Sequence, residues 1–494
     1  MINDQFLVPS KIDIPLILTS LGYSDQYQYD HQDKYNYILH KILEGRVFNR
    51  GMEADDYTVL NFSVLKGFLG IRYTNTILTE LLKLGIIQRN FYIVGKKSFA
   101  YRIAPRFVSK SILRDVFKTE TMGRKLGIQR ATYQKQYTTN TTWKNLTQIG
   151  IKATEALAFI DSKLDVTLAR LKHFESFLSH PFPAMSDDSR EGTVFMDDMG
   201  VKEAQLNLIR LYSSFLLYWS RSLCPFLPLS CMYSLMSLQG VRKAIYNKDN
   251  QGVTLYQHLC ANVINKHSSD KLSILKIANG DFFMEQPDKD SRLFTNVSSL
   301  ATDLRPFLYR RTSNSLLSNM DIRNSQPYLF SLLLNAEYQG SGIPKDVRHY
   351  IQLTADGSFY EHMMSLLDVN AKERQAFKRH FFATIFFCNA KHSRGTKEGK
   401  VFNQHFPNVY KLINKLKEDG HAQLAIQMQR AEAAVILKTI GGELTRQRIW
   451  FATIHDSVVV QQEHAEATKA LILDAFMKAV GIAPTVKEEP FTTA

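Results

Sequence analysis

The chain has 494 residues, of which 45% are hydrophobic and 22% are charged, ordinary values for a folded protein of two to four domains. This composition excludes collagen-like, disulfide-scaffold and wholly disordered classes. Lysine and arginine number 61 against 47 aspartates and glutamates, which gives a formal net charge of +14. Such an excess favours a polyanionic partner, because each neutralised phosphate releases condensed counterions.

The cysteines and the N-terminus indicate a reducing compartment. No two cysteines have Cys-x-x-Cys spacing, so neither a structural zinc site nor a disulfide framework is expected. The first residues, MINDQFLVPS, lack the cationic start of a signal peptide, and no apolar run reaches the ~20 residues needed to span a bilayer. We therefore expect a cytoplasmic protein without a membrane partner.

Residues 1–34 are polar and rich in tyrosine, which predicts a loosely packed arm or an entry strand. From Tyr35 the pattern becomes helical, and three helices are expected. They cover Tyr35–Ile42, Val59–Gly70 and Tyr73–Leu84, the last of which is stopped by Gly85.

A hairpin is predicted directly after these helices. The stretch IIQRNFYIVGKKSFAYRIAP alternates like two strands joined at Gly95, with Lys96 and Lys97 at the tip. Helices followed by a basic hairpin predict a winged helix-turn-helix domain over residues 35–108. Such a domain either contacts DNA, here through Lys96 and Lys97, or serves as a packing module for protein contacts.

The segment 96–144 is the most basic part of the chain, with twelve lysines and arginines against Asp115 and Glu120. Aromatic residues are interleaved with these cations, at Tyr101, Tyr133, Tyr137 and Trp143. This pattern suits a nucleic-acid groove, although a solvated helical face would look similar.

The middle of the chain is predicted to be helical. One long helix or a helical hairpin is expected from Thr147 to Leu178, and apolar helical pattern dominates from Leu208 to Asn279. We therefore predict a basic, helical region over 109–206 and a helical scaffold over 207–287.

Four elements after residue 288 carry residues suited to catalysis. A strand-like stretch surrounds Arg292, an apolar run ends on Asp321 before a helix, and a hydrophobic hairpin holds His455 and Asp456 at its turn. The helix KERQAFKRHFFATIFF spaces four residues so that they share one face: Arg374, Lys378, Phe382 and Phe386.

Two carboxylates that each end an apolar strand can meet on one sheet. Such a pair holds two Mg²⁺ ions roughly 3.5–4 Å apart, which stabilise the attacking and leaving oxygens of a phosphoryl transfer. A helix that presents cations and then flat rings on one face can bind a triphosphate and stack on a base. Each element alone is common, but the ordered combination is far rarer and indicates phosphoryl transfer that involves a nucleoside triphosphate.

In this order the motifs resemble the polymerase domain of the family A DNA polymerases and their relatives, the single-subunit phage RNA polymerases. SRLFT followed by SSL is similar to the segment before the family's first catalytic strand, MDIRNSQP to motif A, the Arg374 helix to motif B, and IHDSVVV to motif C. VFNQHFPNVYKLI, LAIQMQRAEAAVIL and APTVKEEPF also match in order. The resemblance covers about residues 288–494. It implies an α+β right-hand polymerase, with an antiparallel palm sheet and helical fingers and thumb. The basic helical region 109–206 would then be thumb-like, and the winged helix-turn-helix domain predicted above would precede the polymerase domain.

The resemblance also implies a role for each matching residue. Asp321 and Asp456 would be the catalytic residues that bind two Mg²⁺ ions, with Mn²⁺ as an alternative. The nucleotide would be bound by Arg374, Lys378, Phe382, Phe386 and Gln326. The primer and template would be contacted by Arg292, Gln429 and His455, in addition to Lys96 and Lys97 of the hairpin.

Departures from the family pattern bear on the choice of sugar. Phe386-Phe387 stands where relatives commonly carry Tyr-Gly, and the missing hydroxyl favours deoxynucleotides. Gln326 stands where DNA polymerases usually carry a glutamate that crowds the sugar 2′ position. Asp456 is followed by serine, as in the RNA polymerase relatives. No exonuclease carboxylate set is seen upstream, so proofreading is not expected.

We therefore expect a phage or mobile-element type of DNA polymerase, acting in the cytoplasm of a bacterial host. Its partners would be nucleoside triphosphates and a DNA primer-template, with RNA as an alternative. Other functions remain open on the same sequence: an RNA polymerase, a primase or a template-independent tailing enzyme. A non-catalytic winged-helix initiator or regulator that binds duplex DNA is a further alternative. The sequence identifies no replication-protein partner.

Overall fold

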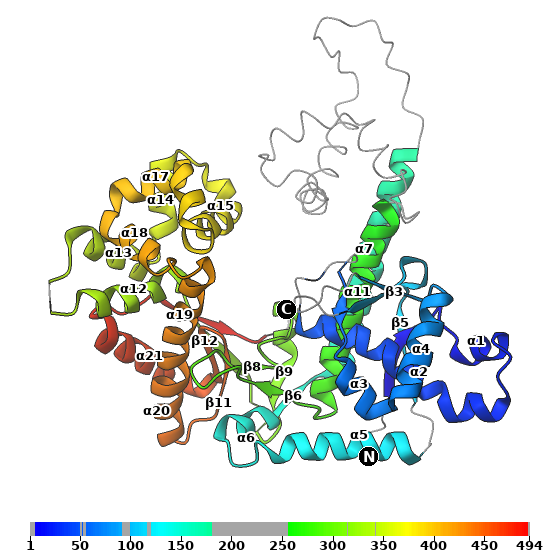
Figure 1. Ribbon diagram of the computed structural model, residues 1–494. Coiled ribbons are helices and arrows are strands. Elements are labelled where there is room, and N and C mark those ends of the chain that lie inside the picture. The colour runs from blue at the N-terminus through cyan, green and yellow to red at the C-terminus, as the bar shows by residue number, and fades with distance from the viewer. Residues whose placement is uncertain are drawn as a thin grey trace, which may run out of the picture. The chain divides into compact units, whose positions relative to one another are not determined.

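The computed structural model describes residues 5–49, 52, 56–90, 99–115, 120–179, 255–313, 315–340 and 342–492. It is a helix-rich α+β protein whose chain forms two compact units (Figure 1). The first unit comprises Met1–Gln129 and Leu157–Leu272, and the second comprises Arg130–Ala156 and Ser273–Ala494. Each unit is therefore built from two separate stretches of chain. Across the described residues, no helix is both long and apolar enough to cross a membrane.

The first unit begins with β1 (Gln5–Pro9), α1 (Ile14–Ser20) and α2 (Asp25–Phe48). β1 pairs antiparallel with β5 (Ser111–Asp115), and four of its five residues, Phe6 to Pro9, are buried. The prediction of a loose arm is therefore wrong for residues 5–34, and the alternative of an entry strand holds for β1. α2 begins at Asp25 rather than Tyr35 because the Ser24 side chain accepts a hydrogen bond from the Tyr27 amide and caps the helix.

A three-stranded antiparallel sheet and two helices follow α2. In chain order they are β2 (Thr58–Val59), α3 (Phe62–Leu69), α4 (Ile71–Lys83), β3 (Ile87–Arg89) and β4 (Ala100–Ile103). The sheet order is β2-β4-β3. The helices predicted over Val59–Gly70 and Tyr73–Leu84 are confirmed within a few residues as α3 and α4. α3 begins later than predicted because Thr58 and Val59 form a strand. The hairpin tip with Lys96 and Lys97 lies outside the described residues.

Longer helices link the two units along the chain. They are α5 (Glu120–Lys135), α6 (Thr141–Thr147), α7 (Ala153–Ser179) and α11 (Leu255–Ala278). The expected long helix up to Leu178 is confirmed as α7, but β6 (Ile149–Ile151) precedes it. Residues 180–254, which include parts of the predicted thumb-like and scaffold regions, lie outside the described residues.

The second unit is organised around a four-stranded antiparallel sheet, called here the central sheet. Its order is β11 (Phe451–Ile454), β12 (Ser457–Gln461), β10 (Leu317–Ile322) and β13 (Val486–Pro490). Two smaller pairs join β6 to β9 (Leu308–Arg310) and β7 (Met284–Glu285) to β8 (Phe294–Thr295). The predicted hairpin, closing strand and Asp321 strand are thus confirmed as elements of one sheet.

Helices cover the central sheet. α21 (Ala465–Val480) packs on three of its strands, and α12 (Ser325–Tyr338) packs against both α21 and α19 (His421–Ala433). The first unit also contains a short 3₁₀ helix, η1 (Pro105–Phe107), and the second unit contains three: η2 (Thr302–Phe307), η3 (Ala371–Glu373) and η6 (Gln462–His464). α19 continues through a π-helical stretch, η5 (Ala434–Ile440), into α20 (Gly441–Arg446).

A group of short helices, yellow-green to orange in Figure 1, gathers on the side of α12 away from β6 and β9. They are α13 (Lys345–Ala355), α14 (Phe359–Leu367), α15 (Arg374–Phe382), α16 (Ala390–Gly395), α17 (Lys397–His405) and α18 (Pro407–Lys415). α15 passes directly into a π-helical turn, η4 (Ala383–Phe387).

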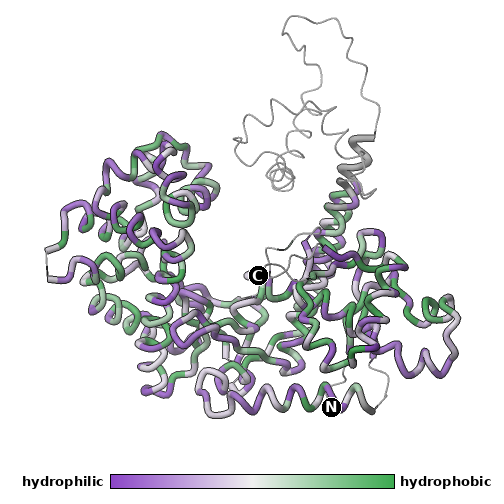
Figure 2. Tube along the Cα trace, viewed as in Figure 1, coloured by the Kyte–Doolittle hydropathy of each residue, from purple (hydrophilic) through white to green (hydrophobic). Residues whose placement is uncertain are grey.

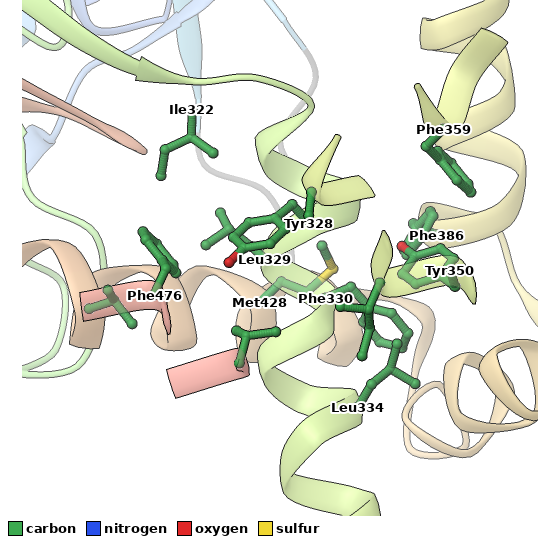
Figure 3. Close-up of a cluster of buried hydrophobic side chains, with 14 of the residues drawn as sticks. Ile322, Tyr328, Leu329, Phe330, Leu334, Tyr350, Phe359, Phe386, Met428 and Phe476 are labelled. Carbon is green, nitrogen blue, oxygen red and sulfur yellow. The ribbon is translucent and has the colours of Figure 1, made fainter. Parts of the chain in front are cut away.

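One hydrophobic core joins this helical group to the central sheet. Ile322, Tyr328 and Phe476 lie at its sheet end, and Phe330, Tyr350 and Phe386 lie toward the short helices (Figure 3). Its rings meet mostly edge to face, the arrangement that aromatic quadrupoles favour. Figure 2 shows hydrophobic and hydrophilic residues interleaved along most helices, as expected for helices with one buried face. Because the core is continuous, α12 and α15 are held firmly relative to the sheet.

Candidate active site

Asp321 and Asp456 lie at the same end of the central sheet. Asp321 is near the end of β10, and Asp456 is in the two-residue loop between β11 and β12. β10 pairs with β12 so that Met320 faces Val458, and one step further this register puts Asp321 opposite Ser457, the residue after Asp456. The structure therefore brings together the two aspartates that the sequence analysis singled out.

The electrostatics of Asp321 reflect this placement. Burial, and then the negative charges of Asp456 and Glu489, raise the pKa of Asp321 to about 6. Glu489 comes from β13, the neighbouring strand on the other side. The charged form of Asp321 is thus disfavoured by desolvation and by like charge.

Three cations offset part of this negative charge. Lys378 from α15 and Lys487, which pairs with Asp321 from the neighbouring strand β13, both act to lower the pKa of Asp321 against the larger effect of burial. Burial lowers the pKa of the Arg305 guanidinium, and the three carboxylates named above act in the opposite direction. Within the described part of the chain, the buried Nε of Arg305 has no hydrogen-bond partner. The site therefore contains a buried cationic donor whose hydrogen-bonding capacity is not used by the described residues.

His455 occupies a strained position in the hairpin loop. Its φ is +55°, in the left-handed region that a side chain disfavours, at the loop position where glycine is usual. Its ring contacts Phe294 edge-on at 5.9 Å between centroids, and its buried Nδ1 has no hydrogen-bond partner among the described residues. Burial, and then the positive charge of Arg292, lower the pKa of His455, which favours the neutral ring.

Arg292 is held by Glu432, a residue that the sequence analysis missed. The Arg292 guanidinium donates to both Glu432 oxygens, from Nε at 2.6 Å and from Nη2. The Gln326 amide donates to the same carboxylate at 3.2 Å. The Glu432 side chain is only 1% exposed, and burial raises its pKa while Arg292 opposes that effect. One buried carboxylate thus orients two predicted substrate-binding residues.

The residues that the spacing of four places on one face of the predicted nucleotide-binding helix differ in their burial and in their contacts. Lys378 is half-buried, with Nζ 5.5 Å from the centre of the Tyr360 ring. Arg374 donates from Nε to Glu361 at 2.7 Å and so is already in an ion pair. The structure therefore places Lys378, rather than Arg374, within electrostatic reach of Asp321.

The two predicted aromatic residues of this helix are stacked on each other. Phe382 is half-buried, and its ring lies 4.6 Å from that of Phe386 with an interplanar angle of 19°. Phe386 is completely buried, and it also contacts Phe330 of α12. The ring of Phe386 is therefore part of the core in this conformation (Figure 3).

The donor set at the end of the sheet fits a hard divalent cation. Carboxylate oxygens are the ligands that Mg²⁺ and Mn²⁺ prefer, and a raised pKa is what closely placed carboxylates show without a cation. Among the described residues, no group of three or more histidine, cysteine or acidic residues could hold a metal. The protein would thus supply two aspartates, and water and substrate oxygens would complete the coordination.

A cavity of about 380 Å³ is lined by Leu293 and Ala433, the residues that directly follow Arg292 and Glu432 in the sequence. The other lining residues are mostly polar or basic: Tyr137, Asn140, Thr142, Met284, Gln286, Lys289, Leu437 and Lys438. Gln429 is on α19, one helical turn before Ala433, and is half-buried. This cavity offers cationic and hydrogen-bonding groups beside the site.

No protein-family model matches the sequence, and no curated protein matches it. Among solved structures, the chain is similar to the POL domain of Pol1 from M. smegmatis in complex with a DNA primer-template and dNTP. The TM-score is 0.40 and the identity is 9%, over 91% of this chain and 80% of that chain. Similarity at this level does not establish a shared fold.

Proposed function

We propose that this protein is a template-directed nucleotidyltransferase, a DNA polymerase without proofreading that extends a primer 3′-hydroxyl. One observation carries the proposal: Asp321 and Asp456 lie at neighbouring ends of β10 and β12, and Asp321 has a pKa of about 6 in the absence of a cation. The ordered motifs around these aspartates, which resemble those of the family A polymerases, support it. A palm and fingers would then correspond to the central sheet and the short helices.

In this proposal, Asp321 and Asp456 hold two Mg²⁺ ions. When bound, such ions stabilise the attacking and leaving oxygens of the phosphoryl transfer. Lys378 binds the triphosphate, because it approaches the aspartates from α15 and carries a charge opposite to that of the phosphates. The Arg305 guanidinium, which feels the charges of both aspartates, binds a further phosphate oxygen. Arg374 assists only if it leaves Glu361 when the nucleotide arrives.

The primer end is assigned to Arg292, His455 and Gln429. Glu432 fixes the Arg292 guanidinium, which contacts the primer terminus with His455, while Gln429 contacts the minor groove of the duplex. Gln326 is held by the same carboxylate and crowds the sugar 2′ position, which favours deoxynucleotides. Phe382 packs on the incoming nucleotide, and Phe386 supports it from the core; Lys96 and Lys97 would contact DNA from the hairpin.

Primer extension tests the proposal directly. We expect Mg²⁺-dependent incorporation of labelled nucleotides, and we expect Asp321→Asn or Asp456→Asn to lower it by on the order of 10²–10³-fold. Asp474→Asn is the matched control, because Asp474 is an exposed aspartate of α21 whose contact is an ion pair with Lys478. Full activity in the doubly substituted protein would refute the proposal.

The same assay separates the alternatives. Ribonucleotide incorporation would indicate an RNA polymerase or primase, and incorporation without a template would indicate a tailing enzyme. An initiator or regulator without catalysis would bind duplex DNA and incorporate neither kind of nucleotide. The placement of Asp321 beside Asp456 and its raised pKa argue against this last alternative, because a site that no longer binds cations has no reason to keep two adjacent, half-buried carboxylates.

A further inference from the structure

The first unit presents a polar stripe on α4 that takes no part in the site described above. α4 buries Thr74, Ile77, Leu78 and Leu81, and the opposite side of the helix is open to solvent. The stripe on that side, called here the α4 stripe, consists of Arg72, Asn75, Thr76, Thr79 and Lys83. Four of these side chains are exposed and Thr76 is half-buried. The α4 stripe spans roughly 16 Å along the helix.

The acidic residue of α4, Glu80, does not belong to the α4 stripe. Glu80 accepts hydrogen bonds from the hydroxyl groups of Tyr23 and Tyr35, one on each carboxylate oxygen. Tyr35 is completely buried, so Glu80 is tied to the side of the helix that faces the core. The α4 stripe therefore carries two cations and three uncharged hydrogen-bonding groups, and no carboxylate.

α4 is also rigidly supported. Gly70, with φ +87°, makes the turn between α3 and α4, and a side chain there would be strained. Thr74 donates to the Gly70 carbonyl at 2.8 Å, and the apolar side of α4 belongs to the core of the first unit. A helix held in this way can present its outer side chains with a fixed spacing.

We propose that the α4 stripe is a second DNA site, which binds duplex DNA in the major groove. The major groove, about 12 Å wide, accepts an α-helix, and the second helix of a helix-turn-helix pair is the one that enters it. Arg72 and Lys83, at the two ends of the stripe, bind phosphates or guanine. Asn75 lies between them and has the amide that pairs with adenine. This inference does not depend on the proposed polymerase activity.

A library of covalently closed dumbbell duplexes with a randomised stem tests the proposal on the full-length protein. A dumbbell has no 3′ end, so binding at a primer terminus is not measured. We expect selection to enrich a short base-pair motif, and Arg72→Ala to weaken binding to that motif about tenfold and reduce its salt dependence. Asn75→Ala should reduce discrimination at one position of the motif, also by about tenfold.

Arg114→Ala is the matched control, because Arg114 is an exposed arginine of the same unit on β5 and lies off the α4 stripe. It should leave the motif and the affinity unchanged, and circular dichroism should show that all three variants are folded. An unenriched library would overturn the proposal, and so would an enriched motif that Arg72→Ala and Asn75→Ala leave intact. Loss of nucleotide incorporation in Asp321→Asn with the motif retained would separate this site from the polymerase site.

Discussion

Asp321 makes the folded protein less stable at neutral pH when no cation is bound. Its pKa is raised from the ordinary 3.8 to about 6 by burial and by Asp456. Above pH 6 the group is charged in both the folded and unfolded states, and the folded state bears the desolvation penalty. As the pH falls through 6 toward 4, the folded state takes up the proton first, so the penalty disappears.

We therefore expect Asp321→Asn to raise the melting temperature by a few degrees at pH 8 in a chelating buffer, with the difference vanishing near pH 4. Thermal melts followed by circular dichroism at several pH values measure this. The control, Asp474→Asn, removes only a surface ion pair and should change the melting temperature little at any pH. Equal melting temperatures of wild type and Asp321→Asn at pH 8 would contradict the explanation.

Glu432 has a positioning role that can be separated from stability. Glu432→Gln keeps the shape but removes the charge that holds Arg292, and we expect primer extension to fall about tenfold. Glu432→Ala leaves Arg292 unpaired and should lower the free energy of unfolding by about 3–5 kcal/mol. In a double-mutant cycle, Arg292→Ala should lose little further activity when Glu432→Gln is already present. Additive losses would show that the two residues act independently.

At the scale of single residues, the sequence pattern predicted which residues belong to the site better than it predicted how their side chains are oriented. Asp321 and Asp456 could be found because each ends an apolar strand, which limits where a carboxylate can go. Glu432 could not, because a glutamate in a helix ordinarily faces solvent, and only the fold shows that it meets Arg292. Phe386 shares the periodicity of Lys378, yet packing against Phe330 buries it completely.

The hairpin between β11 and β12 stores backbone strain at His455. An alanine there keeps the unfavourable φ of +55° and loses the contact with Phe294, whereas a glycine accepts that φ. We expect His455→Gly to be more stable than His455→Ala by about 1 kcal/mol, measured by denaturant unfolding. Both variants should have reduced primer extension, since both lack the ring. A more stable alanine variant would mean that the loop relaxes out of the left-handed region.

At the scale of elements, strands and helices with strong periodicity were predictable and helix starts were less so. The hairpin, the closing strand and the helix through Val480 were all placed correctly. The start of α2 at Asp25 was missed because DQYQYDHQDK has little apolar periodicity, and the capping by Ser24 outweighs it. The π-helical turn after Phe382 has no sequence signature, because it differs from an α-helix only in hydrogen-bond register.

At the scale of the whole molecule, the division into units depends on contacts that local pattern does not report. β6 pairs with β9, and the Trp450 indole donates to the Asn145 carbonyl at 3.0 Å, so residues 130–156 belong with a sheet that follows much later in the chain. Sequence periodicity identifies strands but not their distant partners. It therefore could not include residues 130–156 in the predicted palm.

A fragment limited to residues 288–494 should consequently fail to fold cooperatively. It lacks β6 and the carbonyl that Trp450 needs, so we expect a broad, non-cooperative thermal transition. Residues 130–156 joined through a flexible linker to 273–494 restore the complete second unit and should melt cooperatively. Circular dichroism and calorimetry compare the two fragments. A cooperative transition in the shorter fragment would show that β6 is dispensable.

Because β10 lies inside the central sheet, the backbone of Asp321 should be less mobile than that of Asp456. The backbone of Asp321 is bordered by β12 on one side and β13 on the other, whereas Asp456 is at the tip of a two-residue loop. Amide hydrogen exchange should therefore be slow around Asp321 and fast at Asp456. A cation at this site would meet one stationary ligand and one that can approach or retreat, so ions of different radius could be accommodated by movement of the hairpin tip alone.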